Sequence, residues 1–600
     1  MPEIAEHGLI GDLRTAALVA TDGTVDWLCV PRFDSPSVFG ALLDEERGGA
    51  WRMSPTCDVS GAHQFYFPDT NVLITRFLTE DGVVEVQDLM PVGATDDALP
   101  RGLVRRVVAV RGAMELATEV RPRFGYGEHA AEVSAPDEDD DGNAIAFAHG
   151  DTTLVLRATV PLERGDGAAT GTFSLDEGES VAFTLAFDAE TALDPGDAAE
   201  LLGATVRFWR DWLSQSTYRG RWRETVHRSA LTLKLLTHRP TGAILAAPTT
   251  SLPEHVGGDR NWDYRHVWSR DAAFSAYALL SLGFLDEARA FVTWLTDRLR
   301  DADGDESASG PLAVLYDLDG RRDRPERELG HLRGFRGSAP VRVGNDASSQ
   351  RQLDIYGEVV DSVYLYNKHG SPISAATWAD LVGIVDWVCE NWDGEDEGIW
   401  ETRTGRKDHT YSRLMCWVAI ERTIRIARQR GLPGDLNRWM AARDAIFRQV
   451  MERGWDEERG AFVQHYGSQA LDASLLLMPM VKFLSPSDPR FVATLDAIGE
   501  ELVSDSLVYR YDRDLSPDGL DGEEGTLSIC SFWYVEALTR AGRLEHARVA
   551  LEKMFTYANH LGLYAEQIGR TGDQLGNFPQ AFTHLALISA AINLDRALDA

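Results

Sequence analysis

Residues 414–427 read LMCWVAIERTIRIA, and this stretch indicates the fold class of the longer part of the chain. Its large apolar residues recur at steps of three or four, as one face of an α-helix requires. Similar runs follow one another after residue 220, and residues 582–594 are apolar on nearly every face, as expected for a helix buried on both sides. The remaining length, at roughly thirty residues per helix and loop, predicts about twelve helices. A closed double ring of helix pairs, with its loops gathered at one end around a pocket, would fit this number.

Residues 1–193 show a different pattern, in which short runs rich in β-branched residues are separated by Asp, Gly and Pro. Asp22-Gly23 stands between two such runs and is a hairpin signal. Strands at this spacing predict an antiparallel β-sandwich. Residues 194–219 begin with Asp194-Pro195, which is a helix start signal, and carry an aromatic stripe. We therefore predict a β-sandwich over 1–193, a helical linker over 194–219 and a helical domain over 220–600.

The chain has a formal net charge of −35, which opposes binding to nucleic acid or to anionic membrane surfaces. No apolar run reaches the ~18 residues of a membrane span, and the N-terminus lacks the basic and apolar segments of a signal peptide. We therefore expect a cytoplasmic protein with a small substrate and with no membrane or nucleic-acid partner. The histidines and cysteines share no metal-ligand spacing and no Walker-type glycine loop is present, so we expect no metal and no cofactor.

Two segments carry the predicted chemistry: Glu397-Gly398-Ile399-Trp400-Glu401 and Ala565-Glu566-Gln567. One carboxyl that gives a proton and one that takes a proton are the minimum for cleaving an acetal. A general acid keeps its proton at neutral pH only where its surroundings disfavour the charged form, and Ile399, Trp400 and Glu397 would do this for Glu401. Glu566 is then the predicted general base, which draws a proton from the attacking water. An inverting reaction of this kind places the two carboxyls roughly 6.5–9.5 Å apart.

Five loop segments, in the same order along the chain, resemble glycoside hydrolase family 15, the glucoamylase and bacterial trehalase-like family. They are residues 261–271 (NWDYRHVWSRD), 340–345 (PVRVGN), 352–358 (QLDIYGE), 398–401 (GIWE) and 565–567 (AEQ). The resemblance covers nearly the whole chain and implies an (α/α)6 barrel behind a β-sandwich. It also implies exo-acting hydrolysis of terminal α-glucosyl units with inversion, so that β-glucose is released. Glu401 matches the segment of the catalytic acid, and Glu566 matches that of the base.

The resemblance also implies a set of substrate-binding residues. Arg270 and Asp271 would hold the non-reducing side of the glucosyl unit, and a fork of donors beside a pair of acceptors suits the vicinal hydroxyls of a sugar. Tyr264 matches the tyrosine near the attacking water, and Trp268 and Trp400 are candidates for stacking on sugar faces. The other predicted substrate-binding residues are Arg336, Gln352 and Asp354.

Thr402 follows the predicted acid, whereas fungal glucoamylases carry a second Glu at this position. The second sugar is therefore not expected to be bound as it is in the fungal enzymes. Isomalto-oligosaccharides, malto-oligosaccharides and trehalose therefore all stay open as substrates, and the choice depends on loops 301–351 and 504–528. An inverting disaccharide phosphorylase is the alternative, although it needs no base carboxylate and the Glu566 segment is intact. A non-catalytic sugar binder would be expected to lack one of the two glutamates. The sequence does not set the oligomeric state.

Overall fold

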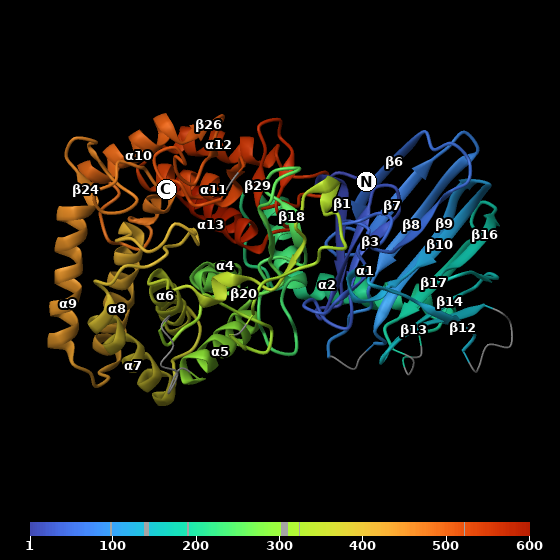
Figure 1. Cartoon of the computed structure of the whole chain (residues 1–600), viewed down its shortest axis with the longest axis horizontal. Helices are drawn as coiled ribbons and strands as arrows, with labels where there is room; N and C mark the ends of the chain where they lie inside the picture. The colour runs from blue at the N-terminus through green and yellow to red at the C-terminus, as the bar shows by residue number, and fades with distance from the viewer. Residues whose placement is uncertain are drawn as a thin grey trace.

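The chain forms a β-rich part from its N-terminal residues and a helical part from the rest, side by side along the long axis (Figure 1). The computed structural model describes residues 1–95, 99–136, 143–188, 191, 193–301, 310–322, 324–520 and 522–600. Within these ranges no helix combines the length and the apolar character that a membrane crossing requires.

The β-rich part consists of two antiparallel sheets with eight strands each in the described ranges. The first sheet contains β1 (His7–Gly11), β2 (Ala16–Ala20), β3 (Val25–Cys29), β4 (Ser37–Phe39), β5 (Ala50–Pro55), β10 (Met114–Arg121), β15 (Glu163–Arg164) and β16 (Ala169–Leu175). The second contains β6 (Gly61–Tyr66), β7 (Leu73–Leu78), β8 (Gly82–Leu89), β9 (Gly102–Gly112), β12 (Glu132–Ser134), β13 (Ala144–His149), β14 (Thr152–Ala158) and β17 (Ser180–Ala186). The predicted antiparallel sandwich is confirmed.

The two sheets pack face to face through aromatic residues and one buried ion pair. Trp51 of the first sheet meets the ring of Phe183 of the second at 6.4 Å between centroids. Arg105 and Asp88, both fully buried, pair at 2.7 Å within the second sheet. Asp88 neutralises the charge of Arg105, which also donates a hydrogen bond to the carbonyl of Gly23 in the turn between β2 and β3 and so joins the two layers.

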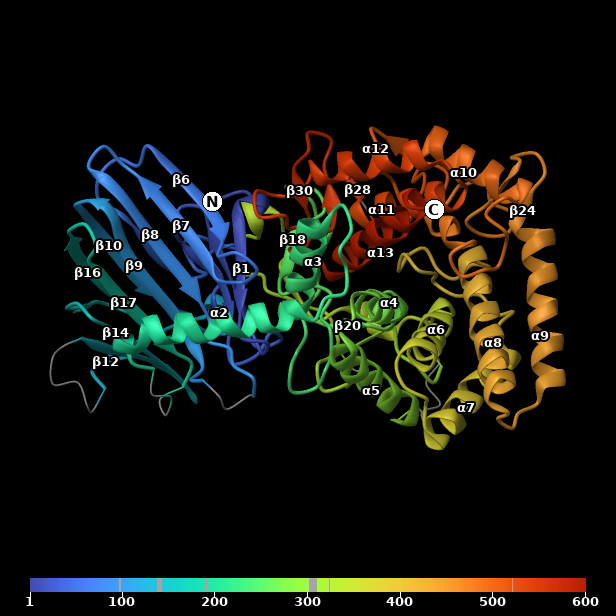
Figure 2. The same cartoon turned by 180° about the vertical axis from the view of Figure 1, so that it is seen from behind.

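Helix α2 (Ala198–Ser214) leads from the sandwich to the helical part, as Figure 2 shows. Trp212 near its C-terminal end stacks on Phe284 with ring centroids 4.1 Å apart and donates a hydrogen bond to Glu287 at 2.7 Å. These contacts fix the helix to the first helical pair of the barrel. The helix lies in the segment predicted as a linker, while the domain boundaries at 193 and 219 remain predictions.

The helical part is a closed double ring in the described part of the chain. Its inner segments contact one another in the cyclic order α4 (Ala272–Leu282), α6 (Asp354–His369), α8 (Thr410–Arg430), η7 (Ala473–Leu477), α11 (Ser528–Arg540) and α13 (Ala581–Leu598). Its outer helices are α3 (Arg223–Leu235), α5 (Leu285–Asp301), α7 (Ala375–Asn391), α9 (Leu436–Gln449), α10 (Pro489–Glu501) and α12 (Leu544–Phe555). This is the expected (α/α)6 barrel.

The inner helices are buried almost all round, because each faces its neighbours in the ring and an outer helix. Helix α8 contains the stretch 414–427, and all but two residues of that stretch are buried. At the crossing of α6 and α8 the backbones approach so closely that a Cβ at Gly357 would lie 2.3 Å from the carbonyl oxygen of Met415. Glycine is required there by this close approach.

The connections from outer to inner helices are long, whereas those from inner to outer helices are short. All inner helices therefore start at one end of the barrel, where the long loops collect as predicted. The sandwich supports these loops from behind. Arg265, in the loop before α4, donates hydrogen bonds of 2.9 Å to the carbonyl of Ser35 and to the hydroxyl of Tyr126. The loop that carries Tyr264 is thus held against the β-rich part.

Candidate active site

Glu401 lies in the loop between α7 and α8, directly after a tight turn. Gly398 has φ +72° and Glu401 itself has φ +57°, a left-handed conformation that costs a non-glycine residue about 1–3 kcal/mol and is concentrated at functional sites. The carboxyl oxygen Oε1 of Glu401 accepts hydrogen bonds from Trp268 Nε1 at 2.7 Å and from Arg270 Nη1 at 3.2 Å. Two donors from the loop before α4 therefore fix this carboxyl in place.

Glu397 makes contacts other than those suggested by the sequence. Its carboxylate accepts hydrogen bonds from Arg406 Nε at 3.0 Å and from the amide of Arg351 at 2.9 Å. The turn at Gly398 intervenes between the two glutamates, and a cation, Arg270, is the charged group in contact with Glu401. The structure shows no contact between the carboxylates of Glu397 and Glu401, contrary to the expectation from the sequence.

Glu566 immediately precedes β29 (Gln567–Ile568), in the loop between α12 and α13, and its side chain is buried. Tyr264 donates a hydrogen bond of 2.5 Å to Glu566 Oε1, whereas Oε2 has no hydrogen-bond partner in the described part of the chain. A Cβ at Gly576 would lie 2.5 Å from Oε2, so the backbone approaches this carboxyl closely. Burial and the negative charge of Glu254 raise the pKa of Glu566, against the lowering effect of the Tyr264 hydrogen bond.

Two aromatic residues join the two carboxyls. Tyr264, which binds Glu566, packs edge to face on Trp268, which binds Glu401, with ring centroids 5.2 Å apart. Burial raises the pKa of the Tyr264 hydroxyl well above its usual value, and the charges of Glu566 and Glu401 contribute to this rise. The negative charges of both carboxyls thus affect the pKa of the same Tyr264 hydroxyl. The loop before α4, which carries Tyr264 and Trp268, brings the two carboxyls together.

The predicted sugar-binding pair lies beside Glu401. Arg270 Nε donates a hydrogen bond of 3.1 Å to Asp271, and burial raises the pKa of Asp271 to about 6 although Arg270 acts to lower it. Asp354 is fully buried at the start of α6 with both carboxyl oxygens unpartnered in the described ranges. Burial and the charge of Asp396 raise the pKa of Asp354 to about 7.

The remaining predicted residues divide between the site and other places. Trp400 lines the pocket and donates hydrogen bonds to Asp472 at 2.9 and 3.0 Å. Gln352 bonds to Gln350, whose amide in turn donates to the carbonyl of Glu401 at 3.2 Å. Gln352 therefore lies behind Gln350, which is the residue that lines the pocket.

Arg336 lies away from the pocket. Its guanidinium pairs with Glu3 at 2.5 Å and donates a hydrogen bond to the carbonyl of Met1 at 2.9 Å. The N-terminal segment of the sandwich therefore engages the side chain that the sequence assigned to substrate, and Arg336 is not brought together with the other predicted residues.

The pocket contains charged residues that the sequence interpretation missed. Its internal volume is about 60 Å³, and its lining includes Glu254, Arg260, Arg403, Arg510 and Asp518. Glu254 accepts a hydrogen bond from Trp262 Nε1 at 2.9 Å, and Arg260 binds Asp518 at 2.9 Å. These residues come from the loops before α4, α8 and α11.

A signal for some of these residues existed in the sequence. Arg510 and Asp518 belong to loop 504–528, which was expected to shape the site beyond the first sugar. Glu254 follows directly after β18 (Thr250–Pro253), but nothing in a single Glu shows that its charge acts on Glu566, the predicted base. Among the described residues no group of three or more His, Cys, Asp or Glu side chains is arranged to hold a metal ion.

Comparison with known families decides the class of the protein. Residues 220–592 match the glycosyl hydrolases family 15, and residues 1–159 match the trehalase-like N-terminal domain. The chain belongs to glycosyl hydrolases family 15. The pocket lined by Glu401 and Tyr264, together with Glu566 bound to Tyr264, is accordingly the candidate active site of a glycoside hydrolase.

Similar proteins extend over the full length of this family 15 chain. A protein named trehalase from Mycolicibacterium smegmatis is 42% identical, over 99% of this chain and 92% of the relative. A trehalase from Thermoplasma volcanium is 36% identical, over 100% of this chain and 94% of the relative. A crystal structure of a bacterial glucoamylase complexed with acarbose covers 98% of this chain and 94% of its own with a TM-score of 0.74 at 12% identity, which shows the shared fold.

Proposed function

We propose that this family 15 hydrolase cleaves a short α-glucoside from its non-reducing end with inversion, and that the substrate is trehalose. Glu401 is the general acid that protonates the glycosidic oxygen. Glu566 is the general base that takes a proton from the attacking water. The observation that carries the proposal is that Tyr264 and Trp268, in mutual contact, each hold one of the two carboxyls, and that Tyr264 and Glu401 line the same pocket.

The surroundings of Glu566 suit a base. Its Oε2 has no partner in the described ranges and is available to accept the proton of a water molecule. A raised pKa makes the ionised carboxylate a stronger base, so proton removal is more favourable once the group has lost its own proton. Tyr264 keeps the other oxygen fixed, so only Oε2 is presented to the water.

The surroundings of Glu401 suit an acid that acts on a bound sugar. Trp268 and Arg270 both bind Oε1, which leaves Oε2 to carry the proton toward the glycosidic oxygen. Arg270 also pairs with Asp271, so the residues proposed to hold the non-reducing glucose are rigidly connected to the acid. This connection positions the scissile bond relative to the proton donor.

The choice of trehalose is supported by the similar proteins, which are named trehalase over nearly the whole chain. The pocket wall beyond Glu401 carries Arg260, Arg403 and Arg510, whose donors suit the hydroxyls of a second glucose. Such a short substrate accords with the cytoplasmic location expected from the sequence, which remains a prediction.

Proton NMR of the reaction tests this proposal. Trehalose contains two α-linked anomeric carbons, so inversion at one of them releases β-glucose and α-glucose in an initial ratio of one to one. Maltose and isomaltose, in separate tubes, report the other linkages. Only α-glucose in the first minutes would refute inversion, and glucose 1-phosphate formed only with added phosphate would establish the phosphorylase instead. Faster release from maltose or isomaltose would refute trehalose as the substrate.

A further inference from the structure

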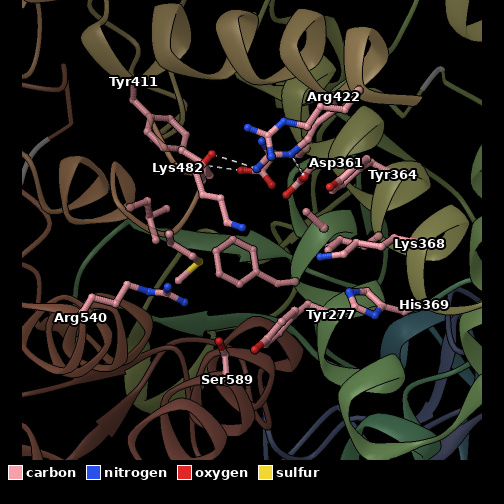
Figure 3. A pocket seen from close by; sticks show the side chains of 18 residues that line it. Tyr277, Asp361, Tyr364, Lys368, His369, Tyr411, Arg422, Lys482, Arg540 and Ser589 are labelled. Atoms are coloured by element: carbon pink, nitrogen blue, oxygen red, sulfur yellow. Dashed lines mark hydrogen bonds and ion pairs between the residues drawn. The ribbon is translucent and has the colours of Figure 1, made fainter. Parts of the chain in front are cut away.

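A second cavity lies inside the barrel, away from the active-site loops. Its internal volume is about 190 Å³, somewhat larger than the apolar cavity of about 150 Å³ that suffices to bind benzene. Side chains from α4, α6, α8, α11, α13 and the segment after η7 form its walls, as Figure 3 shows. It shares no lining residue with the pocket that holds Glu401.

The inner surface of this cavity is mainly apolar. The side chains that provide it are Ala273, Phe274, Leu365, Leu477, Met480 and Val481. Tyr277 and Tyr364 add two further rings. An inorganic oxyanion needs several converging N–H donors, so these walls favour a ligand with an apolar body.

The rim of the same cavity is mainly cationic, although the lining also includes Asp361 and Glu358, the latter bound by the hydroxyl of Tyr411. The chain has a net charge of −35 and only five lysines, yet two of them, Lys368 and Lys482, reach into this cavity. Neither makes an ion pair within the described part of the chain. Figure 3 shows both lysines and Arg540 directed toward the middle of the cavity from different sides.

A buried donor lies in the wall between these groups. Arg422 is 4% exposed and pairs through Nε with Asp361 at 2.5 Å, and it donates from Nη2 to the carbonyl of Val481 at 2.9 Å. Its third nitrogen, Nη1, has no hydrogen-bond partner in the described ranges. A buried guanidinium nitrogen without a partner is costly unless an acceptor visits it.

Helix electrostatics explain only part of this arrangement. Lys368 and Arg540 lie at the C-terminal ends of α6 and α11, where cations are stabilised by the helix dipole. Lys482 lies outside any helix with φ +64°, and Arg422 lies in the interior of α8. Neither residue gains from a helix end, and the pairing with Asp361 leaves Arg422 Nη1 without a partner among the described residues, so Lys482 and this nitrogen need another explanation.

We propose that this cavity binds a small organic acid, with its carboxylate at Lys368, Lys482 and Arg422 and its apolar body against Phe274 and Met480. The apolar walls select the body, and the two lysines together with Arg422 Nη1 select the charge. The occupant acts at a site separate from the catalytic pocket, and the inference does not depend on which sugar is cleaved.

The cavity is connected to the active site by stacked rings. Phe274 stacks on Trp533 at 5.9 Å, and Trp533 packs on Trp400 in the wall of the catalytic pocket at 6.0 Å between centroids. Binding next to Phe274 should therefore change the tryptophan fluorescence of the protein. The same contacts give the occupant a route to affect turnover.

The test is a titration of the full chain with octanoate, followed by calorimetry and by tryptophan fluorescence. We expect saturable binding of one octanoate per chain, and about tenfold weaker binding of the uncharged isostere octanol. Raising the salt from about 50 mM to about 500 mM should weaken octanoate binding, because the rim lysines are exposed. No saturation with octanoate, or equal affinity for octanol, would overturn the proposal.

Three variants locate the site. The double variant Lys368→Ala with Lys482→Ala should weaken octanoate about tenfold, and Met480→Glu should abolish binding by placing a like charge in the wall. Lys553→Ala is the control. It removes one positive charge from an exposed lysine on α12 that pairs with Asp505, and it should leave octanoate binding unchanged. An equal loss of octanoate affinity in the Lys553 variant would show a non-specific charge effect and refute the site. Binding of inorganic phosphate as tight as that of octanoate would also refute it.

Discussion

Replacing Tyr264 with Phe removes one hydroxyl group and keeps the ring. The hydroxyl donates a 2.5 Å hydrogen bond to Glu566 Oε1 and thereby lowers the pKa of that carboxyl. The ring that packs on Trp268 is retained in the variant. The perturbation is therefore confined to the stability of the ionised form of the proposed base.

The magnitude follows from the type of hydrogen bond. A hydrogen bond to a charged group contributes about 1.5–3 kcal/mol. At about 1.36 kcal/mol per pKa unit, its loss raises the pKa of Glu566 by about one to two units. Because the base acts only when ionised, the acid limb of kcat/KM moves to higher pH by the same amount. Well below the pKa, activity falls about 10–100-fold, and it recovers as the pH rises.

The assay is the pH dependence of kcat/KM for trehalose hydrolysis in the wild type and two variants. Glu254→Gln is the matched opposite case, because it removes the negative charge that raises the pKa of Glu566 and keeps an acceptor for Trp262. Its acid limb should move to lower pH. An unmoved limb in the Tyr264 variant, or shifts of the same sign in both variants, would refute the assignment of Glu566 as the ionised base.

Further variants test the two roles and the barrel. Glu401→Gln and Glu566→Gln should each lower kcat on trehalose by about 10²–10⁴-fold. Because fluoride leaves without protonation, the Glu401 variant should keep most of its activity on α-glucosyl fluoride, measured as released fluoride; equal loss in both variants would contradict the acid role. Gly357→Ala should lower the free energy of unfolding by about 1–3 kcal/mol in urea titrations, because the new Cβ meets the Met415 carbonyl. Gly383→Ala on α7 meets nothing within 4 Å and is the control, expected to be neutral or stabilising.

The fold class could be predicted from periodicity because burial follows secondary structure in a regular way. The stretch 414–427 lies within α8, and the apolar run 582–594 lies within α13. The strand runs before residue 193 fall in the two sheets. The closure of the helical ring could not be derived, because it depends on which helices contact one another. The predicted number of helices was compatible with a closed ring but did not require one.

The site could be predicted where its residues are neighbours in sequence. Tyr264, Trp268, Arg270 and Asp271 come from one short segment, so one recognised motif brought all four to the site: Tyr264 lines the pocket, Trp268 and Arg270 bind Glu401, and Asp271 binds Arg270. Arg336 shows the opposite case, because its partner is Glu3 at the other end of the sequence and no local pattern reveals that contact. Glu254 was missed for the same reason, because its charge raises the pKa of Glu566 across a distance in space that the sequence does not show.

The two carboxyls are set apart by what surrounds each of them. Arg270 lies against Glu401, whereas Glu566 is buried beside the negative charge of Glu254. Burial and the charge of Glu254 raise the pKa of Glu566 and so disfavour its ionised form. In the transition state, however, positive charge develops on the sugar ring between the two groups and stabilises an ionised base. The substrate itself therefore completes the electrostatics of the site, and the α-glucosyl fluoride comparison measures this directly because it separates the need for an acid from the need for a base.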